Sequence, residues 1–244
     1  MPANSNFQQA IREAQSSALI GPNVVNKALP YVGGGMVLTG VGVLGGLSVY
    51  GSPLFMPLFF VALIAEIALF FVASSAANNA NNEKALPLLA AYSLLTGFTL
   101  SGLVAVANLV AGPGSIFTAV TATGLTFVIA SYAGRRMSDS VGQALQQVVG
   151  LGLLGLIIAM LVGFIGGFIA PATFAFGSGF ELMIAGFGTV LFIGASFVDF
   201  YTMPRRYNDD QYLAGAMGMY LTYINLFMFI LRLIIALQGG GRRD

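Results

Sequence analysis

The sequence predicts an all-α membrane protein with seven transmembrane helices, and three observations lead to this fold class. Only 8% of the 244 residues are charged, against about 25% in a typical soluble domain. Hydrophobic residues make up 57%, more than one water-soluble core can hide, because about 25–30% of the unfolded surface stays exposed at this size. Apolar windows of about 20 residues, the length that crosses a bilayer, recur along the chain. These observations exclude a soluble enzyme and a nucleic-acid-binding protein, and they make the lipid bilayer the main partner.

The first four spans are bounded by turn-forming or charged residues. The first covers residues 29–50 and ends at a Gly-Ser-Pro turn. The second covers 54–75 and meets an Asn-rich turn, while the third covers 86–110 and ends at Gly-Pro-Gly. The fourth covers 116–133 and stops before a pair of arginines. Glycine and proline at these boundaries favour turns over continued helix.

The last three spans follow the same rule. Residues 145–170 end before a proline, and residues 182–203 end before Pro-Arg-Arg. The seventh span, 212–237, is followed by a glycine-rich polar tail, 238–244. The transmembrane domain therefore covers residues 29–237.

The first 28 residues form a polar arm rather than a secretory signal peptide, because no long apolar stretch follows a basic start. We expect a short helix around residues 6–16 and a cytoplasmic location for the arm. With the N-terminus inside, the inside segments hold seven of the ten basic residues and the three outside loops hold none. This is the orientation that the positive-inside rule favours. The seven are Arg12, Lys27, Lys84, Arg135, Arg136, Arg205 and Arg206.

Two points of topology and location follow. Seven spans place the basic tail outside, against the rule, so a re-entrant seventh span is an alternative. The absence of cysteine and the short loops favour a multi-pass protein of a prokaryotic plasma (inner) membrane.

The absence of two residue types excludes several kinds of catalytic and metal-binding site. The chain has no cysteine and no histidine, which excludes thiol nucleophiles, histidine–metal centres and His-dependent triads. Since the carboxylates within the spans lie at different depths, we find no catalytic set and expect no enzyme activity and no cofactor. A retinal protein is excluded because the seventh span contains no lysine.

Three charged residues lie inside spans, where an ionised side chain costs at least about 2.5–3.5 kcal/mol and marks a functional candidate. Asp199 either lines an ion pathway or pairs with Arg205 or Arg206 near the inner end of its span. Glu66, about 13 Å from the inner end of its span, lies in a polar pathway or forms a structural hydrogen bond. Arg232 either snorkels to the outer headgroups or belongs to a polar stripe. Thr222, Asn225, Phe229 and Arg232 form this stripe, which their spacing places on one face of the seventh span.

Glycine is abundant within the spans, with 32 residues in the chain. Gly42 and Gly46 form one small-xxx-small pair, and Gly163 and Gly167 form another. Such pairs let helices approach closely in lipid.

Five segments resemble the Bax inhibitor (transmembrane Bax inhibitor motif) family, in its bacterial form, across about residues 27–237. The seventh span reads Met-Tyr-Leu-Thr-Tyr-Ile-Asn-Leu-Phe at 219–227 and Leu-Arg at 231–232, similar to the closing signature of the family. Similar motifs are Leu-Thr-Gly-Phe-Thr-Leu at 95–100, Ser-Tyr-Ala-Gly-Arg-Arg at 131–136 and Phe-Val-Asp at 197–199. Glu66 falls where many bacterial relatives have a glutamate.

The resemblance implies a fold, an activity and a pH sensor. The fold is a bundle in which the last helix is central and surrounded by the other six. The activity is a passive, pH-sensitive Ca²⁺ leak, with links to stress response and suppression of cell death. In the family two aspartates share a proton; Asp199 matches the first, but Thr222 occupies the second position. Ala77 occupies the place of a basic residue that latches the first aspartate. We therefore expect a weak or acid-shifted pH response.

Two functional hypotheses remain. The first is a cation-leak channel in which Asp199, Thr222, Asn225 and Glu66 supply oxygen ligands, with Asp199 as a candidate Ca²⁺ ligand. The second is an interaction protein that uses the N-terminal arm to modulate a membrane protease without transport, as some bacterial relatives do.

Overall fold

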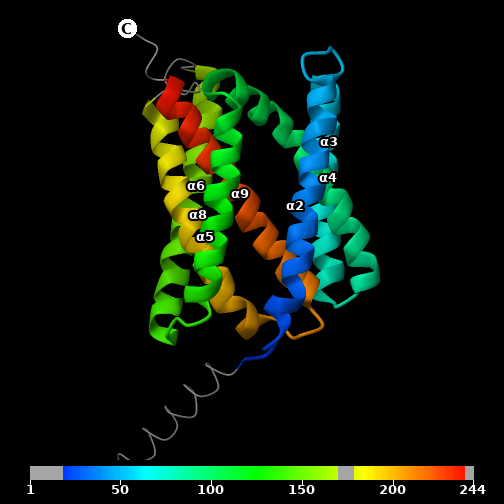
Figure 1. Ribbon diagram of the computed structural model, residues 1–244, viewed down its shortest axis with the longest axis vertical. Coiled ribbons are helices and arrows are strands. Elements are labelled where there is room, and N and C mark those ends of the chain that lie inside the picture. Colours follow the sequence, from blue (N-terminus) through cyan, green and yellow to red (C-terminus); the bar gives the residue numbers. More distant parts are fainter. Residues whose placement is uncertain (1–18, 170–178, 240–244) are drawn as a thin grey trace, which may run out of the picture.

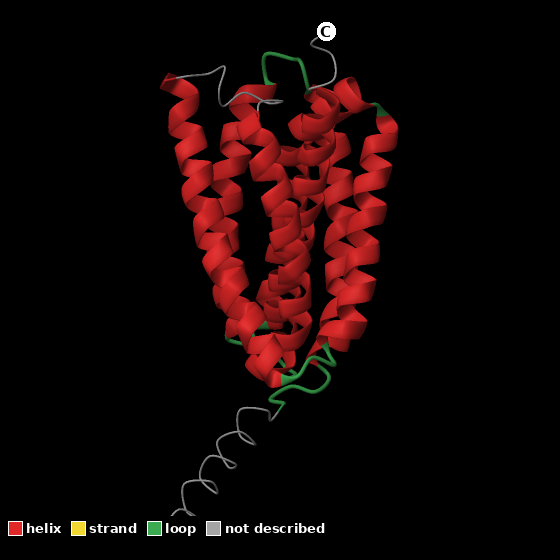
Figure 2. Ribbon diagram, turned by 90° about the vertical axis from the view of Figure 1, so that its left-hand side faces the viewer, coloured by secondary structure: helices red, strands yellow, loops and turns green. Residues whose placement is uncertain are grey.

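A computed structural model describes residues 19–169 and 179–239 (Figure 1), and all regular secondary structure in these ranges is helical. Seven helices there are long and apolar enough to cross a membrane, which confirms the fold class. Their bounds are α2 Val24–Val49, α3 Phe55–Asn78, α4 Asn82–Ala111, α5 Pro113–Gly134, α6 Asp139–Ile169, α8 Gly179–Arg206 and α9 Tyr212–Gly239. The helices run between two ends of the bundle and the loops are confined to those ends (Figure 2).

Several helices are longer than the apolar spans. Helix α2 begins at Val24 and α6 begins at Asp139, in both cases before the first residue of the span. Helix α8 continues to Arg206, with two arginines in its last turn. Asp139 in the first turn of α6 and the two arginines in the last turn of α8 complement the helix dipole, so these two polar ends remain helical. The short helix expected at 6–16, residue 170 and tail residues 240–244 lie outside the described residues.

The helices form two groups, with α9 running between them. Helix α4 contacts α2 and α3 on one side, and α8 contacts α5 and α6 in the other group (Figure 1). Helix α9 contacts α2, α3, α4, α5 and α8, whereas α6 packs mainly on α8. Residues on α9 therefore face both groups, and the helix offers two separate interior surfaces.

Glycine allows the closest helix contact in the first group. A side chain at Gly42 would overlap the backbone of α4 at Leu94 and Gly97, and one at Gly46 would overlap Ser101. This pair therefore acts at a helix–helix contact, as its spacing indicates. Gly163 lies against Phe180. Gly167 has open space beside it within the described part of the chain.

At one end of the bundle, the start of α2 meets the turns that follow α5 and α8, and the turn after α8 also contacts the connection between α3 and α4. We call this end, with residues 19–23, 79–81, 135–138 and 207–211, the basic end. Asp209 accepts from the backbone and side chain of Asn23 at 2.9 and 3.1 Å, and Arg135 donates to Asn26 at 3.0 Å. Helix α9 is continuous, so it does not return, and its last turn lies at the opposite end (Figure 1).

Candidate functional site

The site is centred on Asp199 of α8, at the interface with α9. Its Oδ2 atom is enclosed and has no hydrogen-bond partner among the described residues. The hydroxyl of Thr222, on α9, faces this carboxyl group, and Thr222 itself is only 8% exposed. Burial removes the hydration of the carboxyl group, and the hydroxyl of Thr222 does not satisfy Oδ2, so this arrangement is costly.

The arginines near Asp199 in sequence are directed elsewhere. Arg205 pairs with Asp139 at 3.0 Å and also donates to the Tyr201 carbonyl at 2.8 Å. The guanidinium of Arg206 lies over the Tyr207 ring, 5.4 Å from its centroid. The interfacial pair between Asp199 and these arginines is therefore not the arrangement present. Ala77, at the latch position, is fully buried and brings no charge.

The other residues of the α9 stripe have different roles: Asn225 and Phe229 make contacts without charge, whereas Arg232 forms an ion pair. Asn225 is half-buried, and its amide donates to the Leu221 carbonyl at 2.8 Å, so it is satisfied within its own helix. Phe229 is buried and stacks on Phe192 of α8 with ring centroids 5.4 Å apart. This stacking fixes how α8 and α9 face each other, and thereby places Thr222 opposite Asp199.

Arg232 forms a two-point ion pair with Glu181, in the first turn of α8. Its Nε lies 2.7 Å from one carboxylate oxygen and its terminal nitrogen lies 2.9 Å from the other. The side chains are 20% and 8% exposed, so the ion pair is largely enclosed by protein. The predicted span began one residue after Glu181, which left this partner in a loop. The acidic residue at a helix start was the available signal.

Glu66 lies on the other side of α9 and is held by α4. Its two oxygens accept from Thr96 at 2.8 Å and from Thr99 at 2.9 Å. The hydroxyls of Tyr220, on α9, and Thr39, on α2, lie 2.7 Å apart. Both threonines that bind Glu66 belong to the 95–100 motif, and their i, i+3 spacing was a signal for this contact. Asp199 and Glu66 therefore lie in separate polar sites.

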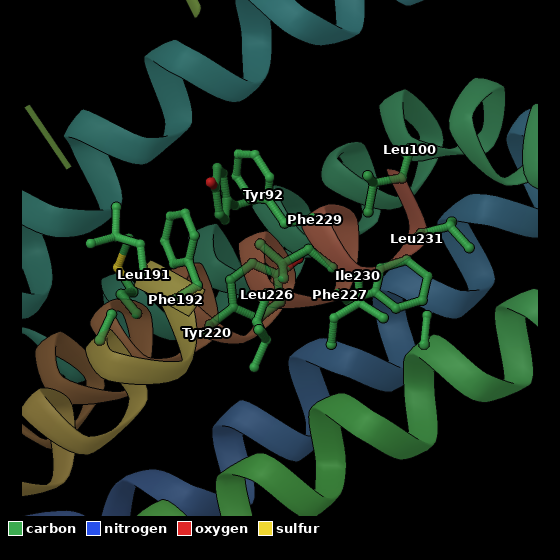
Figure 3. Packing of buried hydrophobic residues seen from close by; sticks show 14 of the residues in the cluster. Tyr92, Leu100, Leu191, Phe192, Tyr220, Leu226, Phe227, Phe229, Ile230 and Leu231 are labelled. Atoms are coloured by element: carbon green, nitrogen blue, oxygen red, sulfur yellow. The ribbon is translucent and has the colours of Figure 1, made fainter. Parts of the chain in front are cut away.

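Large apolar side chains fill the space around α9 between these sites. Tyr220, Leu226 and Leu231 are fully buried, and Figure 3 shows them among Tyr92, Phe192 and Phe229 in one continuous cluster. These buried side chains separate the site of Asp199 from the site of Glu66 in this conformation. The described residues contain no group of three acidic, His or Cys side chains that could hold a metal ion, so Asp199 is a single candidate ligand rather than part of a cage.

Comparison with known proteins shows which family and which relatives the chain is similar to. A family model described as "Inhibitor of apoptosis-promoting Bax1" matches residues 21–239. The chain is similar to the uncharacterized protein YrjE of Lactococcus lactis, with 27% identity over 79% of this chain and 76% of the relative. An uncharacterized membrane protein of Streptococcus pyogenes serotype M1 is 28% identical over 77% of this chain and 76% of its own.

A third relative carries the family name. A protein named Bax inhibitor 1, from Schizosaccharomyces pombe, is 35% identical over 60 residues, which is 25% of this chain and 23% of that protein. Because the family model covers almost all of the helical region, the chain belongs to the Bax inhibitor family.

Proposed function

We propose that this chain is a channel-like membrane protein that mediates a passive Ca²⁺ leak, with Asp199 as the residue that the cation meets. The observation that carries the proposal is the enclosed Oδ2 of Asp199, which has no hydrogen-bond partner among the described residues. A carboxylate inside a membrane protein is a functional candidate by default, and an ion pathway is one of its established roles, because its cost must be offset by a partner. A passing cation or a proton supplies that partner.

The chemistry of the site favours a transient cation over a resident one. Ca²⁺ takes six to eight oxygen ligands, whereas this site offers one carboxylate and the hydroxyl of Thr222. Water must supply the remaining ligands, so binding is weak. Weak binding suits a leak, since an ion held tightly would not leave.

Passage of an ion requires a conformational step. Tyr220, Leu226 and Leu231 are fully buried, and the cavities beside α9, of about 220 Å³ and 250 Å³, are not lined by Asp199, so an ion passes only when α9 shifts against its neighbours. Because a proton and a Ca²⁺ ion both bind the ionised carboxylate of Asp199, the two compete, and the leak depends on pH. Thr222 in place of a second carboxylate weakens that dependence or moves it to more acidic pH, because a neutral neighbour does not oppose ionisation.

The remaining features belong to the same proposal. The chain lies in a prokaryotic plasma membrane with its basic end in the cytoplasm, catalyses no reaction and carries no cofactor. Asn225 and Glu66 are further polar groups that a hydrated cation meets when α9 moves. The link to stress response follows from the family alone.

The test is a Ca²⁺ flux assay with the full chain in liposomes that contain a Ca²⁺-sensitive dye, from about pH 6 to pH 8. Flux above that of protein-free liposomes, with no added energy source, supports the proposal. Flux equal to the protein-free control at every pH overturns it.

A further inference from the structure

A pocket of about 420 Å³ opens between α3 and α4 at the basic end. Its lining includes Phe71, Val72, Ser75, Asn79, Asn81 and Lys84. The volume falls within the range of about 300–1,000 Å³ that small-molecule sites occupy. The pocket is separate from Asp199 and from Glu66, so the proposed leak does not use it.

Lys84 is the basic side chain of this pocket, and its ammonium group has no hydrogen bond, ion pair or ring contact within the described residues. Every other basic side chain within the described residues has at least one such contact. Their partners are Asp209 for Lys27, Asn26 for Arg135, Tyr132 for Arg136, Asp139 for Arg205, Tyr207 for Arg206 and Glu181 for Arg232. The pocket therefore offers a positive charge that the protein does not neutralise.

The wall formed by α3 changes from apolar to polar towards the basic end. Phe71, Ser75 and Asn79 are four residues apart, so they lie in a row on one face of α3. Phe71 is 66% and Val72 is 45% exposed, and both lie on the membrane side of the pocket. The row covers about 12 Å along the axis. A phospholipid changes from an apolar acyl chain to a polar phosphate over a similar length.

The polar side of the pocket can donate hydrogen bonds to an anion. The Asn79 amide uses one N–H for the Ser75 carbonyl at 2.8 Å, and its second N–H remains. Asn81 uses its oxygen to accept from the Lys84 backbone at 3.3 Å, and its amide nitrogen remains a donor. Two amides and one ammonium form a set of donors that suits a phosphate group.

We propose that the α3/α4 pocket binds the headgroup of an anionic phospholipid from the leaflet at the basic end. The phosphate lies against Lys84 and the two amides, and the first part of one acyl chain follows Phe71 and Val72. Basic pockets between transmembrane helices recognise lipid headgroups in this manner.

The experiment is native mass spectrometry of the full chain in detergent, titrated with phosphatidylglycerol. We expect Lys84→Gln to weaken binding about fivefold, the effect of one basic group near a lipid surface, and Lys84→Arg to retain it. Ser75→Trp, which fills the pocket without changing charge, should also weaken binding. Arg136→Gln removes an equal charge at the same end outside the pocket and is the matched control.

Two outcomes overturn the proposal. One is equal weakening by Lys84→Gln and Arg136→Gln, which would show a general surface effect. The other is displacement of phosphatidylglycerol by millimolar inorganic phosphate, which would show that the pocket takes a free anion. Neither outcome bears on Ca²⁺ flux, which the liposome assay measures independently.

Discussion

Removal of one partner from the pair between Glu181 and Arg232 should destabilise the protein strongly. Breaking a buried ion pair in this way costs about 3–5 kcal/mol, because the remaining buried charge loses its oppositely charged partner. Arg232 is 20% exposed and Glu181 is 8% exposed, so water screens the pair partly and we expect about 3 kcal/mol. For a chain of 150–250 residues, each kcal/mol shifts the melting temperature by about 2–4 °C. Glu181→Gln should therefore lower it by about 6–12 °C.

The assay is thermal unfolding of the detergent-purified protein, with Glu83→Gln as the control. Glu83 is an exposed carboxylate in the first turn of α4, so its neutralisation should shift the midpoint by less than about 2 °C, as most surface changes do. The double variant Glu181→Gln/Arg232→Gln should be less unstable than the sum of the two single variants, because the pair is lost only once. Equal shifts for Glu181→Gln and Glu83→Gln, or strict additivity, would refute this reasoning.

Three further predictions test other parts of the structure. Thr222→Asp places a second carboxylate beside Asp199, so the leak should acquire a transition nearer neutral pH; an unchanged flux profile between pH 6 and pH 8 would contradict this. Gly42→Leu should abolish the yield of monodisperse protein, because its side chain meets the α4 backbone, whereas Gly45→Leu on the same helix has open space and should be tolerated; similar gel-filtration profiles for both would exclude the close contact. Deletion of residues 1–18 should leave Ca²⁺ flux intact while abolishing any effect on a membrane protease; residues 20 and 21 must stay, since they donate to the Pro204 carbonyl at 2.8 and 3.0 Å.

The helices could be predicted from sequence because lipid leaves the backbone few alternatives. Every peptide group in the bilayer must be satisfied within its own segment, so long apolar windows become helices. The ends were less certain, as α2 and α6 show, because polar residues at a helix terminus still complete hydrogen bonds at the membrane surface. Apolar windows therefore locate spans but not helix termini.

The candidate site was only partly predictable. Spacing along α9 placed Thr222 and Arg232 on one stripe, but it could not assign their partners on α8. That assignment depends on how the two helices are rotated against each other, which the stack of Phe192 on Phe229 and the close approach at Gly188 determine. Single-helix periodicity contains no information about the facing helix.

The partners of Glu66 could not be predicted from the sequence of its own helix either. Its depth in α3 marked it as a polar group, but the choice between an ion pathway and a structural bond required α4. Its hydrogen bonds to Thr96 and Thr99 show how the resting protein holds it, on the face of α9 opposite to Thr222.

The most direct test of the leak proposal compares Asp199→Asn with Glu83→Gln in Ca²⁺-loaded liposomes at about pH 6, 7 and 8. Asp199→Asn keeps the size of the side chain and removes the enclosed charge, whereas Glu83→Gln removes an exposed charge at the basic end. Asp199→Asn should reduce flux at least about tenfold and remove its pH dependence, whereas Glu83→Gln should retain both the flux and its pH dependence. A leak that keeps its rate and its pH profile in Asp199→Asn would contradict a role for Asp199 in the ion pathway.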